Sequence, residues 1–153
     1  MLQKEILFVS FNYRVGALGF LTLDDPSLDV PGNAGLKDQK MALEWIRDNI
    51  KQFGGDPDNV TLFGTSAGGA SVHYHLISDQ SKGLFHRAIA MSGTSMNTSW
   101  ALHPRRNYAE RIAKVCGYDG EQNEGEILKF LEAIEVPRIV EAAEKILTPE
   151  VSA

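Results

Sequence analysis

The chain has 153 residues, of which 43% are hydrophobic and 23% are charged, a composition typical of a globular domain or of a piece of a larger one. Fifteen Lys and Arg stand against 20 Asp and Glu, which gives a net charge of -5, and no basic cluster of the kind that binds nucleic acid is present. No apolar run reaches the length that spans a membrane.

The first predicted element is a strand at residues 6–11. This segment is a nearly continuous apolar run, which is typical of a strand buried on both faces in a parallel sheet. Residues 12–35 show no periodicity and are punctuated by Gly, Asp and Pro, so we expect a long loop there. Because Met1 opens directly into the strand, with no charged region followed by an apolar one, we expect no signal peptide in this stretch.

A crossover helix and two more strands are predicted next. The apolar residues at helical spacing are Ala42, Trp45, Ile46, Ile50 and Phe53. Gly54 and Gly55 are expected to end this helix. Residues 60–63 follow as a second strand, residues 67–78 as a second helix and residues 88–91 as a third strand. The order predicts an α/β fold with three parallel strands and right-handed crossovers.

The rest of the chain has a different, helical texture. Its three apolar stripes comprise Ala109, Ile112, Ala113 and Cys116; Ile127, Phe130, Leu131 and Ile134; and Ile139, Val140, Ala143, Ile146 and Leu147. Gly117 is expected to end the first helix, and Pro137 lies near the start of the third, where proline is tolerated. We therefore divide the chain into an α/β segment at residues 1–93 and a helical segment at residues 94–153.

The most informative motif is Gly-x-Ser-x-Gly at residues 64–68, between a predicted strand and a predicted helix. Such a nucleophile elbow strains the serine backbone and exposes its hydroxyl, which makes Ser66 the candidate nucleophile. Gly64 and Gly68 are expected to be small because larger side chains would clash with strand and helix. A phosphate-binding loop is a competing interpretation, but it needs a lysine at position 70, where this chain has Ala70. An ordinary glycine-rich turn with an inert serine is the structural alternative.

Longer motifs surround this elbow in a fixed order. They are FNYRVGALGFL at residues 11–21, GNAGLKDQ at 32–39, WI at 45–46, FGGDP at 53–57, GLFHRAI at 83–89 and MSG at 91–93. Their order and spacing resemble the type-B carboxylesterase and cholinesterase family, and the helices after Trp100 resemble its insect alpha-esterase branch. The resemblance covers essentially the whole chain.

The resemblance implies ester hydrolysis on an α/β-hydrolase fold, with a serine, an acid and a histidine in that chain order and without a cofactor. Ser66 would attack the ester carbonyl of a small substrate, and the amide of Ala67 would supply one oxyanion-hole donor. Trp100 aligns with a tryptophan that lines the acyl pocket of the family. Thr65 stands where the family has glutamate, so a carboxylate beside the active site is lost.

The same resemblance places other catalytic parts outside this sequence. The His-Gly-Gly segment that completes the oxyanion hole would precede Met1, and the triad acid and histidine would follow Ala153. The chain is therefore expected to be an internal fragment of a longer enzyme.

The four histidines of the chain are not expected to replace the missing base. His73 and His75 lie on the helix that leads away from Ser66, and His86 and His103 lie in connectors. We expect each of them to be satisfied at the surface or in the core.

Other polar residues are given structural interpretations. Asp56, Asp58 and Asn59 fit a turn and lack the glycine and distal glutamate of a calcium loop, so no metal site is expected. Asn59 and Asn97 begin glycosylation sequons, of which the second is the better acceptor. Cys116 cannot form an internal disulfide and lies on an apolar stripe, so we expect it to be buried.

The sequence supports three hypotheses. The first is a serine carboxylic-ester hydrolase that acts on small esters, including the xenobiotic esters suggested by the insect branch. The second is a noncatalytic binding or adhesion module of cholinesterase type, against which the retained Ser66 argues. The third is that the 153 residues alone are inactive and poorly stable, because the sheet would expose apolar edges and faces.

Overall fold

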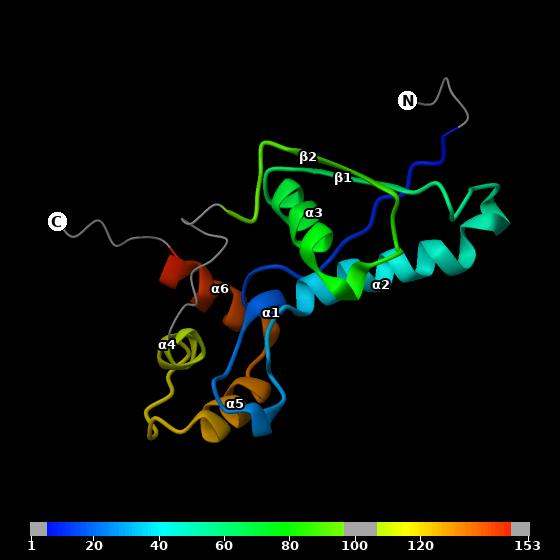
Figure 1. Ribbon diagram of the computed structural model, residues 1–153. Helices are drawn as coiled ribbons and strands as arrows, with labels where there is room; N and C mark the ends of the chain where they lie inside the picture. Colours follow the sequence, from blue (N-terminus) through cyan, green and yellow to red (C-terminus); the bar gives the residue numbers. More distant parts are fainter. Residues whose placement is uncertain (1–5, 97–106, 148–153) are drawn as a thin grey trace. The chain divides into compact units, whose positions relative to one another are not determined.

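The computed structural model describes residues 6–96 and 107–147 of the chain. Its elements in chain order are α1 (Gly16–Phe20), η1 (Pro26–Leu28), α2 (Ala34–Asn49), η2 (Ile50–Phe53), β1 (Thr61–Thr65), α3 (Ala67–Ile77), η3 (Asp79–Ser81), β2 (Arg87–Met91), α4 (Tyr108–Val115), α5 (Glu124–Glu132) and α6 (Val136–Leu147), where η marks a 3-10 helix (Figure 1). None of the helices in the described ranges combines the length and the apolar character needed to cross a bilayer.

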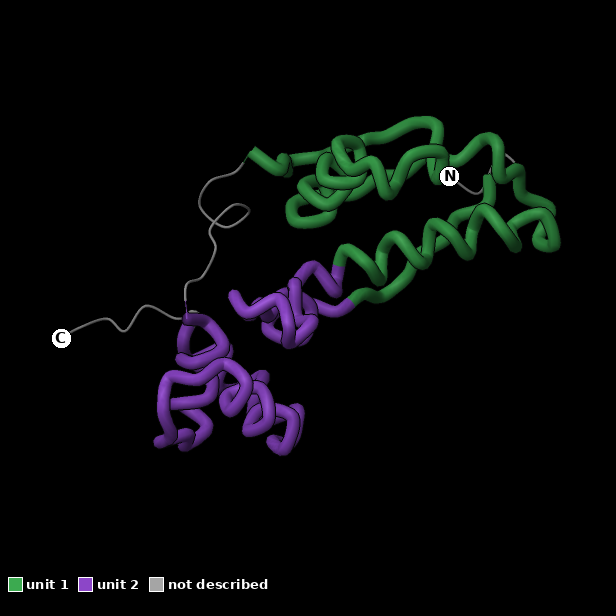
Figure 2. Tube along the Cα trace, turned by 60° about the horizontal axis from the view of Figure 1, so that its bottom comes forward, with its two compact units in different colours: residues 1–13, 36–104 green, residues 14–35, 105–153 purple. Residues whose placement is uncertain are grey.

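The described residues form two compact units, coloured separately in Figure 2. The first unit holds residues 6–13 and 36–96, and the second holds residues 14–35 and 107–147. Residues 14–35 therefore pack with the helices of the tail, although they lie far from them in the sequence. The boundary predicted from the sequence lies instead after residue 93.

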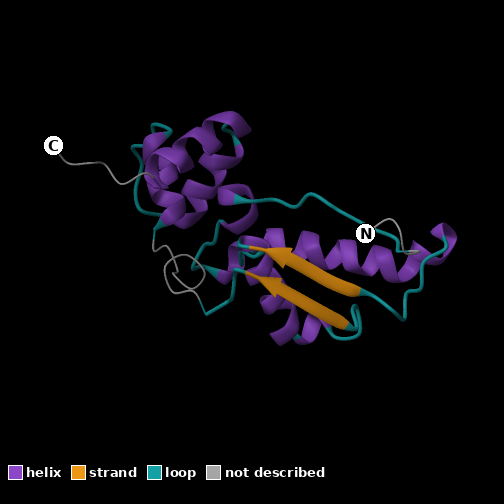
Figure 3. Ribbon diagram, turned by 90° about the horizontal axis from the view of Figure 1, so that it is seen from above, coloured by secondary structure: helices purple, strands orange, loops and turns teal. Residues whose placement is uncertain are grey.

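The first unit contains a two-stranded parallel sheet with a helical crossover. Strands β1 and β2 pair in register from Thr61 opposite Arg87 to Thr65 opposite Met91. The two strands run in the same direction, and α3 packs against both of them (Figure 3). The predicted order of strand, helix and parallel strand is confirmed here, with boundaries that differ by one or two residues.

The predicted strand at residues 6–11 is wrong for the described structure, because this segment has no regular secondary structure. Within the described ranges, β1 pairs only with β2, and the apolar run forms no ladder with the open edge of β1. Its side chains remain open to solvent, with Ile6 53% and Phe8 55% exposed. An apolar run is thus not sufficient to predict a paired strand.

Apolar side chains of the sheet are exposed as well, as the sequence analysis predicts. Phe63 on β1 is 38% exposed, and Ile89 and Met91 on β2 are 52% and 41% exposed. These strands are therefore not buried on both faces by the described residues. Parallel sheets are normally covered on both faces, so the described residues leave the sheet only partly enclosed.

Helix α2 begins at Ala34, earlier than the predicted apolar stripe, and continues into η2. Ile46 and Ile50 of the predicted stripe are buried, together with Gln39 and Leu43, which lie outside that stripe. Trp45 and Phe53 are instead 47% and 58% exposed and contact each other, with ring centroids 5.7 Å apart. The predicted stop is confirmed, since Gly54 follows η2 with a φ of 81°, which favours glycine.

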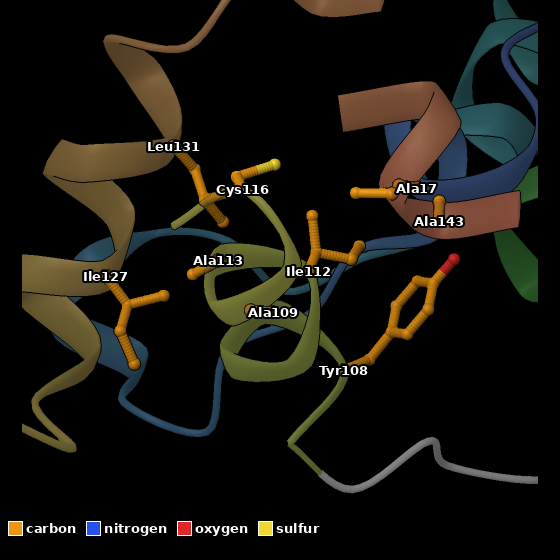
Figure 4. Close-up of a cluster of buried hydrophobic side chains, with 10 residues drawn as sticks. Ala17, Tyr108, Ala109, Ile112, Ala113, Cys116, Ile127, Leu131 and Ala143 are labelled. Carbon is orange, nitrogen blue, oxygen red and sulfur yellow. The ribbon is translucent and has the colours of Figure 1, made fainter. Parts of the chain in front are cut away.

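The second unit has its own hydrophobic core, built mainly by α4, α5 and α6 (Figure 4). Its buried members are Ala17, Tyr108, Ala109, Ile112, Ala113, Cys116, Ile127, Leu131, Ala142 and Ala143. Ile112 lies at 0% exposure, and Cys116 is buried and unpaired, as predicted. The three helical stripes read from the sequence therefore correspond to one core.

Residues 14–35 belong to this unit and are more ordered than the predicted loop. They contain α1 and η1, and Ala17 of α1 lies in the core. The carboxylate of Glu124 on α5 accepts backbone hydrogen bonds from Asp24, at 3.0 Å, and from Asp25, at 2.7 Å. This contact joins segments a hundred residues apart, which no sequence periodicity reports.

Candidate active site

Ser66 occupies the turn between the end of β1 and the start of α3. Its backbone has a φ of 54° and a ψ of -118°, a combination that L-residues rarely adopt and that costs of the order of 1–3 kcal/mol. Two hydrogen bonds hold it there: the Ser66 amide donates to the Met91 carbonyl at 2.9 Å, and the Ala70 amide donates to the Ser66 carbonyl at 3.0 Å. The strained conformation predicted for the elbow is therefore present in the structure.

The Ser66 side chain is accessible at the start of α3. The residue is exposed, and its hydroxyl makes no capping hydrogen bond to α3. The amide of Ala67 opens the first turn of α3, where helical N–H groups lack intrahelical acceptors and the helix dipole favours negative charge. The Ser66 hydroxyl and the Ala67 amide thus lie on adjacent residues at the start of α3.

Glycines allow the chain to pack this tightly around Ser66. A Cβ built on Gly64 would lie 2.5 Å from the carbonyl carbon of Gly68, so a side chain at position 64 has no room. A Cβ on Gly68 would meet no described atom within 4 Å. A Cβ on Gly93, beyond β2, would overlap the carbonyl oxygen of Ser66. Space at the elbow is therefore limited at Gly64 and Gly93 and open at Gly68.

His73 is directed to the segment after β2. Its Nδ1 accepts the backbone N–H of Ser95 at 3.2 Å and lies 2.9 Å from Thr94 Oγ1 and 3.0 Å from Ser95 Oγ. Because Nδ1 accepts from a backbone amide, the ring proton of a neutral His73 is on Nε2. This histidine anchors the chain beyond the sheet and does not contact Ser66.

His75 is buried and has partners on both ring nitrogens. Nδ1 lies 2.7 Å from Ser81 Oγ, and Nε2 lies 3.0 Å from Gln39 Oε1. Burial lowers the pKa of His75, since the charged ring would lose its hydration. The expectation of a satisfied core histidine is confirmed.

The remaining polar candidates also have structural contacts. His86 Nδ1 accepts the Val60 amide at 3.3 Å. The Asp58 amide donates to Asp56 Oδ1 at 2.9 Å, which is the turn predicted for this stretch. Asn59 Oδ1 accepts from Arg87 Nη1 at 2.6 Å. Three further candidates, Asn97, Trp100 and His103, lie outside the described residues.

Among the described residues, no histidine or carboxylate forms a hydrogen bond with the Ser66 hydroxyl. Within residues 6–96 and 107–147 there is also no cluster of three or more His, Cys, Asp and Glu side chains that could hold a metal ion. Within the described residues, the Ser66 hydroxyl therefore has no hydrogen-bonded side chain that could accept its proton.

A large apolar groove, of about 1130 Å³, lies in the first unit but does not include Ser66. Residues 6–11 form one side, and side chains of β1, β2, α2 and α3 line most of the rest, with the segment between η2 and β1 at one end. Phe8 faces Phe63 across it, with ring centroids 5.9 Å apart. The groove is therefore a gap beside the sheet, and we do not assign it to substrate.

Two features of the site escape a sequence-based search. The close approach of Gly93 to the Ser66 carbonyl joins two strand ends, and the MSG motif at residues 91–93 marks this glycine without reporting the contact. The hydrogen bonds from His75 through Gln39 to Ser71 join α3 to α2, and the motif that ends at Gln39 does not report them.

Comparison with known proteins places this geometry in a family context. A family model described as "Carboxylesterase family" matches residues 1–152. Esterase B1 of Culex pipiens is 53% identical over 150 residues, which cover 98% of this chain and 28% of that protein. Acetylcholinesterase of Gallus gallus is 47% identical over 152 residues, covering 96% of the chain and 19% of that protein. Cholinesterase of Mus musculus is 50% identical over 131 residues, covering 84% and 21%. The chain thus spans between about a fifth and just over a quarter of the length of these relatives.

Proposed function

The chain belongs to the carboxylesterase family, and we propose that it carries the nucleophile of a serine carboxylic-ester hydrolase. The observation that carries the proposal is Ser66: a strained, exposed serine whose hydroxyl contacts no described side chain and whose neighbour opens a helix. Similarity to an esterase and to two cholinesterases supports an ester substrate.

In the proposed reaction the Ser66 oxygen attacks the carbonyl carbon of a small carboxylic ester. A histidine takes the hydroxyl proton and passes it to the departing alcohol, leaving an acyl-enzyme that water hydrolyses. The Ala67 amide donates to the oxyanion of the tetrahedral intermediate. We further propose that Thr65 lies beside the substrate and that Trp100 lines the acyl pocket, as the family resemblance suggests.

We propose that the histidine, its acid partner and the remaining oxyanion donors come from parts of the protein outside these 153 residues. This agrees with the share of each relative that the chain covers and with the contacts of His73, His75 and His86, which lead away from Ser66. On this proposal the 153 residues alone are inactive.

The test is labelling of the full-length protein that contains this chain with a fluorophosphonate probe. We expect covalent modification at Ser66, and we expect Ser66→Ala to abolish both labelling and hydrolysis of a nitrophenyl ester. Ser78→Ala, at the end of α3, is the matched control and should keep both activities. A folded full-length protein that resists the probe would instead favour the noncatalytic binding module. Turnover by purified residues 1–153 would refute the inactivity of the isolated segment.

A further inference from the structure

A buried chain of hydrogen bonds connects α2 to the first turn of α3. Ser81 Oγ contacts His75 Nδ1 at 2.7 Å, His75 Nε2 contacts Gln39 Oε1 at 3.0 Å, and Gln39 Nε2 donates to Ser71 Oγ at 3.2 Å. Ser71 Oγ then donates to the carbonyl of Ala67 at 2.9 Å. His75, Gln39 and Ser81 are only 5%, 4% and 3% exposed, so water does not compete strongly for these bonds.

The chemistry of the partners fixes the direction of donation along this chain. A carbonyl oxygen can only accept a hydrogen bond, so the Ser71 hydroxyl donates its single proton to the Ala67 carbonyl and must accept from Gln39. The Gln39 amide therefore turns its oxygen to His75, which must donate from Nε2. The ring is then neutral with Nδ1 unprotonated, and Nδ1 accepts from the Ser81 hydroxyl. Burial, which disfavours the charged ring, agrees with this form.

The chain of hydrogen bonds ends at Ala67, whose amide the proposed function uses. Ala67 is flanked by two peptide groups, and the first of them carries both the Ser66 carbonyl and the Ala67 N–H. The Ala70 amide holds this first peptide at 3.0 Å, through the Ser66 carbonyl. The Ser71 hydroxyl holds the second one through the Ala67 carbonyl. The direction of the Ala67 N–H depends on both peptides, because they meet at the same α-carbon.

We propose that His75 is a positioning residue that, through Gln39 and Ser71, sets the direction of the Ala67 amide for oxyanion binding. The inference rests on the proposed function, since it assigns a support to the same oxyanion donor. His75 touches neither substrate nor Ser66 in this arrangement. Loss of a whole oxyanion donor typically slows an enzyme by about 10²–10³-fold. Because the amide remains present and is only misdirected, we expect about a 10-fold loss of kcat when the chain is broken.

The experiment uses the full-length protein and two matched pairs of variants. In His75→Gln the new amide can still donate to Gln39, whereas in His75→Asn the shorter side chain reaches Ser81 and loses Gln39. In Gln39→Glu the carboxylate can still accept from His75 but attracts the Ser71 hydroxyl away from Ala67, and in Ser71→Ala the last bond is absent. Rates are divided by the concentration of sites titrated with a fluorophosphonate, so that misfolded protein does not count.

We expect His75→Gln to keep kcat within about twofold of the original protein. His75→Asn, Gln39→Glu and Ser71→Ala should each lose about 10-fold in kcat with KM unchanged, and should lose the same factor in affinity for a trifluoromethyl ketone that forms a tetrahedral adduct. The losses in the double variant His75→Asn/Ser71→Ala should not multiply, because both changes break one chain. The ¹⁵N spectrum of the original protein should show His75 protonated at Nε2.

Several results would overturn the inference. If the variants have lower melting temperatures but keep kcat per titrated site, the hydrogen bonds only stabilise the packing of α2 on α3. Multiplying losses in the double variant, or His75 protonated at Nδ1, would show that the chain does not run to Ala67. These outcomes differ from failure of the proposed function, in which the original protein itself would show no labelling of Ser66.

Discussion

Replacement of Gly93 by alanine tests whether a residue outside the Gly-x-Ser-x-Gly motif holds the Ser66 backbone in place. The Cβ of an alanine at this position would overlap the Ser66 carbonyl oxygen and would lie 2.8 Å from the Ser66 carbonyl carbon and 3.0 Å from the Ala70 nitrogen. Carbon atoms that are not bonded to each other prefer separations of about 3.5–4.0 Å, so the backbone must shift by roughly 1 Å. The peptide that moves is the one that carries the Ala67 N–H.

The expected effects follow from that displacement. A shift of about 1 Å in a catalytic group can cost about 100-fold in rate, and we expect this loss in kcat/KM and in the rate of fluorophosphonate labelling. The overpacking should also lower the free energy of unfolding by about 1–3 kcal/mol. Thermal unfolding monitored by circular dichroism measures the second effect independently of the first.

Gly68→Ala is the control that distinguishes the effect of lost space from the effect of changing a motif residue. Gly68 belongs to the Gly-x-Ser-x-Gly sequence, yet a Cβ there would meet no described atom within 4 Å. We therefore expect Gly68→Ala to keep labelling within about threefold, whereas the motif alone predicts that it is the more harmful change. Normal labelling of Gly93→Ala together with a large loss in Gly68→Ala would refute the geometric reasoning.

Three further predictions concern stability and can be measured on the full-length protein. Ile112→Ala should lower the free energy of unfolding by about 2–5 kcal/mol, because the side chain is fully buried. Val115→Ala, on the exposed side of α4, should change it by about 0.5 kcal/mol or less. Equal losses of stability in chemical denaturation would contradict the assigned core. Glu124→Ala should speed amide hydrogen exchange at Asp24, which loses its acceptor, and unchanged exchange there would remove the link between α5 and the loop. His75 has a lowered pKa in the folded state, so the unfolded chain takes up the proton first as the pH falls. The contribution of neutral His75 to stability is full above about pH 6.5 and is lost as the pH drops toward the folded-state pKa. If the melting temperature of His75→Gln falls with pH as much as that of the original protein, His75 is not the group responsible.

The sequence predicts the local elements well where periodicity and punctuation agree. Strands β1 and β2, helix α3 between them and the three tail helices all follow from apolar spacing and from stops such as Gly54 and Gly117. The motif at residues 64–68 also predicts a strained serine, because a sharp turn between strand and helix leaves its backbone few conformations. These features depend on neighbours within a few residues, which the sequence reports directly.

Features that depend on distant partners are not predicted. The apolar run at residues 6–11 is not a strand in the described structure, since pairing requires a second strand and periodicity says nothing about one. The buried face of α2 differs from its apolar stripe: Gln39 is buried because His75 and Ser71 satisfy its amide, while Trp45 remains exposed. Burial is thus decided by the surface that a helix meets, and the residue type gives only a preference.

The sequence by itself determined that this chain belongs to the carboxylesterase family and carries a Gly-x-Ser-x-Gly turn between a strand and a helix, because the turn and its flanking motifs are local and are read in order along the chain. Only the tertiary structure decided which groups hold the elbow in place. Gly93 limits the space beside the Ser66 carbonyl, and the hydrogen bonds that connect His75, Gln39 and Ser71 end on the Ala67 carbonyl. Both are contacts between elements that are separate in sequence, and their distances exist only once the strands and helices have packed.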